Sequence, residues 1–277
     1  MTQLLRKAFQ VGYRHIDTAI VYGNAPVLGK AFKNLFNDGQ YKREDFFITT
    51  KVFPGIDIEI ESEIKSNLKK MNLNYADLVL VHSPIVPPDP NDIQVVKTLP
   101  HHILWQQMEQ IQKEKLTKNI GVSNFNVQSI SNILSFCNIR PQVNQIELHP
   151  YLMQNELRKY CKNQDIAITG YSNLTRGGKA VEKCVGQVVD MFNEKLLIQL
   201  SEKYKKPISQ IVLNFLYNEN IIVIPKTKSP ERLEENFNFL DFEIEKEDKE
   251  KIKTLDKGIR TLDTKLFDAW GHIDIFA

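Results

Sequence analysis

The stretch FFITTKVF at residues 46–53 is one of several short, almost continuously apolar runs in this chain. Runs of this kind are typical of strands that are buried on both faces. They are separated by longer stretches whose apolar residues recur at helical spacing, as in residues 59–71, where Ile60, Ile64 and Leu68 are four positions apart. Strands that alternate with helices of this length indicate βαβ units and a parallel sheet.

Outward from that run, the same pattern predicts seven strands, at residues 15–19, 46–53, 78–83, 119–124, 143–149, 166–172 and 221–226. Helices are expected at residues 59–71, 102–115, 196–204 and 208–217. Seven strands fit a barrel better than a doubly wound sheet, and no GxGxxG follows any of them, which counts against a Rossmann nucleotide site. The length of 277 residues suits one α/β barrel, so we expect a single domain over residues 1–277.

Net charge, apolar runs and cysteine spacing argue against several classes of binding partner and location. The formal net charge of +2 is too small to argue for nucleic acid or an acidic membrane surface. No apolar run approaches the roughly 18 residues of a spanning helix, and the start MTQLLRKAFQ has no signal-peptide pattern. The three cysteines, Cys137, Cys161 and Cys184, have no CxxC spacing, which favours a reducing compartment and leads us to expect a cytoplasmic protein.

Polar residues stand at the ends of successive predicted strands. In a parallel barrel these carboxyl ends share one face, and active sites lie there, so we expect residues far apart in the sequence to meet. The residues in such positions are Asp17, Lys51, His82, Ser123, Asn124, Gln145, Glu147, Tyr171, Ser172 and Lys226.

Four residues of this group fit one reaction. Tyr22 follows the first predicted strand, and a free tyrosine, with a pKa of about 10, is a poor acid near neutral pH. A nearby ammonium favours the phenolate and lowers that pKa, a role open to Lys51. Asp17 would hold Lys51 charged and oriented, and His82 would orient a carbonyl oxygen. This set suits general acid catalysis matched to hydride delivery.

Each of the four, taken alone, has an ordinary structural explanation. An Asp at a strand end more often caps a helix, and a Tyr before Gly-Asn is more often a turn residue. A Lys after an apolar strand usually extends to the surface, and a His before Ser-Pro is more often a turn or core residue. Together they favour catalysis, because all the types needed for one reaction stand at adjacent strand ends.

These residues lie in motifs that resemble those of the aldo-keto reductases over nearly the whole chain. GYRHIDTAIVYGN carries Asp17 and Tyr22, FFITTKVF carries Lys51 and LVLVHSP carries His82. IGVSNFN, QIELHPYL and IPKTKSPERLEEN are similar to three further family motifs. The resemblance implies a TIM barrel, NAD(P)H as cofactor, and reduction of a small aldehyde, ketone or aldose to an alcohol.

The same resemblance implies the cofactor residues. Ser123, Asn124 and Gln145 would hydrogen-bond the nicotinamide carboxamide, and Tyr171, followed by Ser172, would stack on its ring. Glu235 and Asn236 would contact the adenine, while Lys226, Thr227 and Arg232 would surround the 2′-phosphate. The ordinary alternatives are a strand-end turn for Ser123-Asn124 and a core aromatic for Tyr171.

The phosphate position also has support from the residues themselves. Ser229 is a plausible N-cap, Pro230 suits the first helical position, and ERLEEN continues as helix. A helix N-terminus beside Lys226, Lys228 and Arg232 makes an anion site, or else a capped surface helix with solvated charges. Because guanidinium binds phosphate in bidentate fashion, Arg232 favours NADPH over NADH.

Several departures from the family pattern stand out. The N-terminal hairpin and first barrel strand are missing, so we expect a gap in the barrel wall and a truncated product with weak activity and a tendency to aggregate. Ser83 replaces an aromatic residue, Ala25 replaces a Glu, and the usual SPLG is SNLT at residues 172–175. The loop at residues 84–100 and the tail with Phe267, Trp270, His272, Ile273 and Phe276 would cover the barrel mouth, unless the tail simply covers the barrel side.

Two functions therefore compete. The first is an NADPH-dependent reductase with a small carbonyl substrate, acting as a monomer or weak oligomer. The second is an NADP(H)-binding barrel without turnover that serves as a regulatory or interaction subunit. A metal-dependent hydrolase is disfavoured, because it needs several His and carboxylate ligands, and only His82, with His149 as a second candidate, stands at a predicted strand end.

Overall fold

The computed structural model describes residues 2–86, 98–175 and 189–262. These residues form two compact units, one up to residue 144 and one from residue 145 onward. The expected single domain over residues 1–277 stays a prediction.

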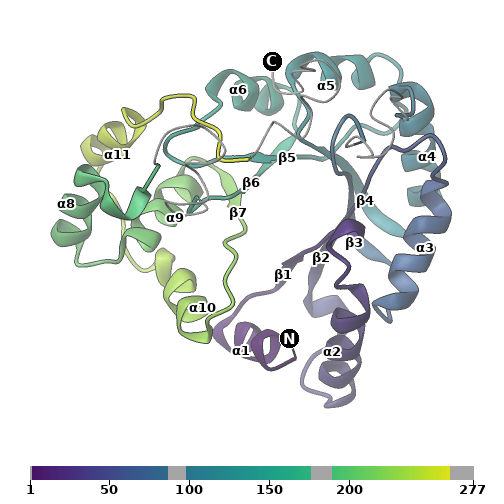
Figure 1. Ribbon diagram of the computed structural model, residues 1–277, viewed down its shortest axis with the longest axis horizontal. Coiled ribbons are helices and arrows are strands. Elements are labelled where there is room, and N and C mark those ends of the chain that lie inside the picture. Colours follow the sequence, from purple (N-terminus) through teal and green to yellow (C-terminus); the bar gives the residue numbers. More distant parts are fainter. Residues whose placement is uncertain (1, 87–97, 176–188, 263–277) are drawn as a thin grey trace, which may run out of the picture. The chain divides into compact units, whose positions relative to one another are not determined.

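The first unit is built on four parallel strands in sequence order. They are β1 (His15–Asp17), β2 (Phe47–Val52), β3 (Ala76–Val81) and β4 (Thr117–Ser123). Its helices are α1 (Thr2–Val11), α2 (Ala25–Asn37), α3 (Ile60–Lys70), α4 (His101–Lys113) and α5 (Val127–Leu134), with short 3₁₀ turns η1 (Ile20–Tyr22) and η2 (Arg43–Asp45). Helices α3 and α4 pack beside one another on the outside of this sheet (Figure 1).

Apolar patterning explains this arrangement. All six residues of β3 are buried, as expected for a strand covered on both faces. Helix α3 turns Ile60, Ile64 and Leu68 inward, one face of a 3.6-residue period. A Cβ at Gly29 of α2 would lie 2.1 Å from the carbonyl oxygen of Lys70, so glycine permits the close approach of α2 to the end of α3.

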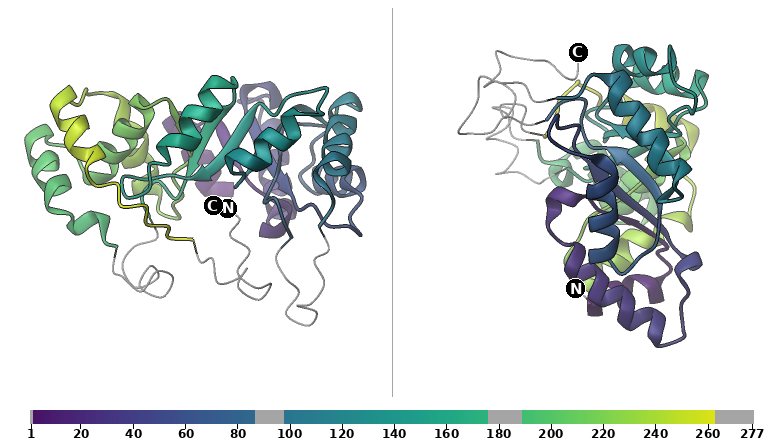
Figure 2. Two further views of the ribbon diagram at one scale, coloured as in Figure 1. Left: turned by 90° about the horizontal axis from the view of Figure 1, so that it is seen from above. Right: turned by 90° about the vertical axis from the view of Figure 1, so that its right-hand side faces the viewer.

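The second unit contains the greater part of strand β5 (Val143–Glu147) and the whole of β6 (Ala167–Tyr171) and β7 (Ile221–Val223), of which β6 and β7 pair in parallel. Its helices are α6 (Asn155–Asn163), α8 (Lys195–Tyr204), α9 (Ile208–Asn218), α10 (Pro230–Phe237) and α11 (Lys246–Lys253), with 3₁₀ turns η3 (Met191–Asn193) and η4 (Asn238–Leu240). Helices α8 and α11 lie side by side in the left view of Figure 2. Helix α9 is buried along most of its length, and the amide of Asn214 donates to the carbonyls of Phe239 and Phe242, both at 2.8 Å.

The seven expected strands and four expected helices are all confirmed, with boundaries that differ by a few residues. Neither Cys137 nor Cys161 forms a disulfide within the described residues, and Cys184 lies outside them. No helix within residues 2–86, 98–175 and 189–262 is long and apolar enough to cross a membrane. Most of the loop at residues 84–100 and the whole aromatic tail also fall outside the described part, so their expected roles stay predictions.

Candidate active site

Lys51 lies near the end of β2 and is only 1% exposed. Its ammonium donates a hydrogen bond to the carboxylate of Asp17, at the end of the neighbouring strand β1, and a second to the carbonyl oxygen of Thr18 at 3.0 Å. Burial lowers the pKa of Lys51, and the Asp17 carboxylate opposes this shift. A buried ammonium is tolerated here because a carboxylate and a carbonyl both accept from it.

Tyr22 sits in the 3₁₀ turn that follows β1. Gly23, with φ of 64°, ends this turn in a left-handed conformation that suits glycine, and its N–H donates to the carbonyl of Ile20. The hydroxyl of Thr18 donates to the side-chain oxygen of Asn24 at 2.8 Å, which closes the loop that carries Tyr22. Lys51 Nζ lies 5.3 Å from the centroid of the Tyr22 ring, and Tyr22 is 52% exposed. The phenol is therefore open to solvent on one side and close to a buried cation on the other.

His82 follows β3, and its ring meets the ring of Tyr22 edge to face, with centroids 5.7 Å apart. Burial first, and Lys51 second, lower the pKa of His82 to about 4, so the imidazole is neutral near pH 7. Its Nδ1 is buried without a hydrogen-bond partner among the described residues. A buried lone pair is cheaper to leave unpaired than a buried N–H, which favours the tautomer with the proton on Nε2.

Ser123 and Asn124 lie at the end of β4 in the same unit. Asn124 has a left-handed backbone with φ of 62°, and its amide donates to the carbonyl of His82 at 2.9 Å and to Ser123 Oγ at 3.2 Å. The first unit thus brings together six of the expected site residues: Asp17, Tyr22, Lys51, His82, Ser123 and Asn124.

In the second unit, the expected cofactor residues lie at strand ends and on α10. Gln145 is buried in β5, Tyr171 is the last residue of β6, and Ser172 after it has a positive φ of 55°. The next residue, Asn173, is buried, donates to the carbonyl of Leu148 at 3.0 Å and accepts from the N–H of Ile224 at 3.1 Å. Its amide therefore joins the segments that follow β5, β6 and β7, a role that sequence reasoning missed.

The start of α10 is confirmed as expected. Ser229 is the N-cap and accepts from the N–H of Arg232 at 3.3 Å, and Pro230 is the first helical residue. The hydroxyl of Thr227 accepts from the N–H of Ser229 at 3.0 Å, while Lys226 and Arg232 are exposed. Further along the helix, Glu235 accepts from the hydroxyl of Ser209 at 2.7 Å and Asn236 is buried.

The model of the aldo/keto reductase family matches residues 1–257. The chain belongs to this family. It is 36% identical over 273 residues to aldose reductase C of Dictyostelium discoideum, with 93% of this chain and 82% of that protein covered. It is 35% identical over 257 residues to methylglyoxal reductase DkgA of Escherichia coli K12, with 92% and 84% covered.

A solved structure has the same fold as this aldo/keto reductase. The crystal structure of a silkworm (Bombyx mori) aldo-keto reductase complexed with NADPH superposes with a TM-score of 0.88 at 31% identity, covering 98% of this chain and 83% of that one. The strands and helices described above therefore belong to an α/β fold with a parallel sheet, as the sequence predicts.

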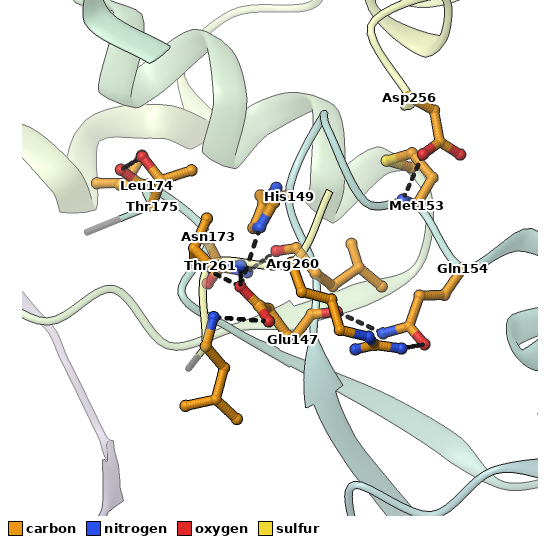
Figure 3. Close-up of polar contacts among 12 residues, drawn as sticks. Glu147, His149, Met153, Gln154, Asn173, Leu174, Thr175, Asp256, Arg260 and Thr261 are labelled. Carbon is orange, nitrogen blue, oxygen red and sulfur yellow. Dashed lines mark hydrogen bonds and ion pairs between the residues drawn. The ribbon is translucent and has the colours of Figure 1, made fainter. Parts of the chain in front are cut away.

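One buried cluster of this reductase was not assigned a role from sequence. Glu147, at the end of β5, accepts from the backbone N–H of Thr261 at 2.7 Å, from the Thr261 hydroxyl, from the N–H of Leu262 at 3.3 Å and from His149 Nε2 at 3.2 Å (Figure 3). Burial alone would raise the pKa of Glu147, but the hydrogen bonds from His149 and Thr261 outweigh it and lower the pKa. Glu147 thus ties the segment around Thr261 to the strand end.

Proposed function

We propose that this aldo/keto reductase uses NADPH to reduce the carbonyl group of a small aldehyde, ketone or aldose to an alcohol. The observation that carries the proposal is the position of Lys51, buried between the carboxylate of Asp17 and the ring of Tyr22. Relatives named as aldose reductase and methylglyoxal reductase, and a related structure complexed with NADPH, support the substrate class and the cofactor.

The roles follow from charge and position. When bound, NADPH would supply a hydride for the carbonyl carbon, and Tyr22 would donate the proton to the carbonyl oxygen. Lys51 stabilises the phenolate that Tyr22 becomes, because an adjacent cation favours the charged form of a phenol. Asp17 keeps Lys51 charged against its burial. His82, neutral and with its proton on Nε2, donates a hydrogen bond that orients the carbonyl oxygen.

The residues proposed for the cofactor suit its chemical groups. Exposed Lys226 and Arg232 flank the capped N-terminus of α10, where cations and backbone dipoles favour a phosphate, and Thr227 lies between them in sequence order. We assign Glu235 and Asn236 to the adenine, and the buried position of Asn236 makes Glu235 the more accessible of the two. Ser123, Asn124 and Gln145 would take the carboxamide, with Tyr171 stacked on the ring and Ser172 beside it.

The proposal includes the TIM-type (β/α)8 barrel fold. The expectation that its first strand is missing, and the loss of activity expected from that, stay predictions. A small carbonyl compound is the proposed partner, and the monomeric or weakly oligomeric state and the cytoplasmic location stay part of the proposal.

The test is consumption of NADPH by the purified protein with an aromatic aldehyde, an aldose and methylglyoxal, followed by absorbance, together with NADPH binding followed by fluorescence. We expect binding and turnover with at least one of the three substrates. Binding without any turnover would instead support the regulatory NADP(H)-binding barrel, and absence of binding would contradict both.

A further inference from the structure

Phe53 and His82 are the first residues after two neighbouring parallel strands, β2 and β3. The strand register pairs Val52 with Val81, and the N–H of His82 donates to the carbonyl of Val52 at 2.8 Å. The backbones of Phe53 and His82 are therefore held side by side. Their rings stack, with centroids 4.7 Å apart and planes inclined by 12°.

The backbone of His82 is fixed on both sides, but its ring is not fixed by hydrogen bonding at Nδ1. The carbonyl of His82 accepts from Asn124, whereas Nδ1 is buried without a partner among the described residues. Hydrogen bonding at that atom therefore does not set the rotation of the imidazole. The ring lies between two aromatic contacts, the stacked face of Phe53 and the edge-to-face ring of Tyr22.

The residue after His82 supplies no ring. Ser83 is buried, and its hydroxyl accepts from the N–H of Ile85 at 3.3 Å. Among the described residues, the rings of Phe53 and Tyr22 contact His82. Tyr22 is half exposed, so its ring is the less confined of the two. The flat contact with Phe53, which is itself partly buried at the end of β2, is the more rigid support.

The electrostatic surroundings of His82 are made by Lys51 on β2, Asp17 on β1 and the phenol of Tyr22. Lys51 opposes and Asp17 favours a charged imidazole, so these two effects offset one another in part. Burial is the largest influence, and the ring of Phe53 covers one face of the imidazole. Phe53 therefore acts on both the orientation and the solvation of His82.

We propose that Phe53 is a positioning residue for carbonyl reduction. Its ring stacks on the imidazole of His82, fixes the plane of that ring, excludes water from one of its faces and so keeps the Nε2 proton directed to the substrate oxygen. This inference rests on the proposed function. It concerns a residue that need not touch the reacting atoms.

The experiment compares Phe53→Leu, which removes the ring, with Phe53→Tyr, which keeps it. The matched control is Phe136→Leu, because Phe136 also contacts a histidine ring, that of His102 at 6.4 Å, but is exposed and is not among the residues around His82. NMR titration, with the His82 signals assigned from the spectrum of His82→Gln, measures the pKa of the imidazole and so tests the contact independently of turnover. Steady-state kinetics with NADPH and an aldehyde read its effect on the reaction.

For Phe53→Leu we expect the pKa of His82 to rise from about 4 toward the ordinary 6.5, and kcat to fall about three- to tenfold with little change in the KM for NADPH. Phe53→Tyr should keep the pKa of His82 and kcat at their wild-type values, and Phe136→Leu should change neither quantity. An unchanged titration in folded Phe53→Leu would overturn the inference. A shifted titration with unchanged kcat would overturn it too, because the contact would then be structural only. If the wild-type protein shows no turnover, the proposed function fails, whereas the titration still tests the contact.

Discussion

The ammonium of Lys51 donates to the carboxylate of Asp17 while lying 5.3 Å from the centroid of the Tyr22 ring. The buried ammonium of Lys51 thus lies beside two groups, the carboxylate of Asp17 and the phenol ring of Tyr22. The carboxylate offsets the cost of burying the charge. In the proposed reaction the same charge would stabilise the phenolate of Tyr22.

Replacement of Asp17 by Asn should destabilise the protein strongly. Removal of one partner from a buried ion pair leaves the other charge uncompensated, at a cost of about 3–5 kcal/mol. The pKa of Lys51 should fall further, because the opposing effect of the carboxylate is lost. Urea unfolding measures the free energy. The control is Asp38→Asn, which breaks the exposed Arg6–Asp38 pair and should cost at most about 1 kcal/mol. Equal losses of unfolding free energy in Asp17→Asn and Asp38→Asn would show that the buried pair stabilises the protein no more than the exposed pair.

Sequence reasoning was sufficient where local pattern and motif decide the structure. The apolar runs around Lys51 and His82 predict β2 and β3, and the Ser-Pro pair predicts the start of α10. The ends of two elements differ from the predicted ends, and each difference has a physical reason. The strand expected at residues 221–226 ends at Val223, because the N–H of Ile224 donates to the side chain of Asn173 and Pro225 has no N–H to give to a sheet. The helix expected to reach residue 115 ends at Lys113, since Lys115 adopts a left-handed φ of 59°.

The contacts that sequence reasoning missed join residues far apart in the chain. Thr261, one of the partners of Glu147, lies more than a hundred residues later in the chain, and nothing local marks this pair. The stacking of Phe53 on His82 depends on the register of β2 and β3, which a list of strands does not give. Asn173 was noticed only as a departure from the family pattern, although its amide joins three segments.

The stability of the protein should depend on the ionisation of His82. Its folded pKa of about 4 lies below the unfolded value of 6.5, so the unfolded state binds the proton more readily between these values. Stability from this source is present above pH 6.5 and is lost as the pH falls to about 4, by roughly 3 kcal/mol in total. Urea unfolding from pH 7 to pH 4 should show a steeper loss in wild type than in His82→Gln. Parallel curves would contradict the shift.

Loss of Glu147 should loosen the segment around Thr261. In Glu147→Ala the Thr261 N–H and hydroxyl and the His149 ring lose their shared acceptor, at a cost of about 2–5 kcal/mol. Hydrogen exchange at Thr261 and Leu262 should accelerate. Glu250→Ala, which removes only an exposed pair with Lys253, should stay within about 0.5 kcal/mol of wild type.

The carboxylate of Glu147 allows a second test, the dependence of stability on pH in the acid range. Because its folded pKa lies below the ordinary 4.5, the stabilisation is complete above that value and is lost only as the pH falls through the folded pKa. Wild type should therefore lose stability more steeply below pH 4.5 than Glu147→Ala. Unchanged exchange and unchanged acid stability in the variant would contradict the anchoring role.

Replacement of Arg232 by Ala should weaken NADPH far more than NADH. Only NADPH carries the 2′-phosphate, and a charge-assisted hydrogen bond contributes roughly 1.5–3 kcal/mol, which corresponds to about ten- to a hundred-fold in affinity. Fluorescence titration with both cofactors gives the two dissociation constants, and NADH serves as the internal control. Equal losses for the two would show that Arg232 does not contact the phosphate.

The most direct test of the central claim is kcat of Tyr22→Phe with NADPH and a substrate that the wild type reduces. Only the hydroxyl is removed, and Tyr22 is assigned to proton delivery rather than to the cofactor. The account predicts a loss of kcat well beyond tenfold, with NADPH affinity almost unchanged. A variant that keeps more than about a tenth of the wild-type kcat, a loss below about 1.4 kcal/mol in the barrier, would contradict it.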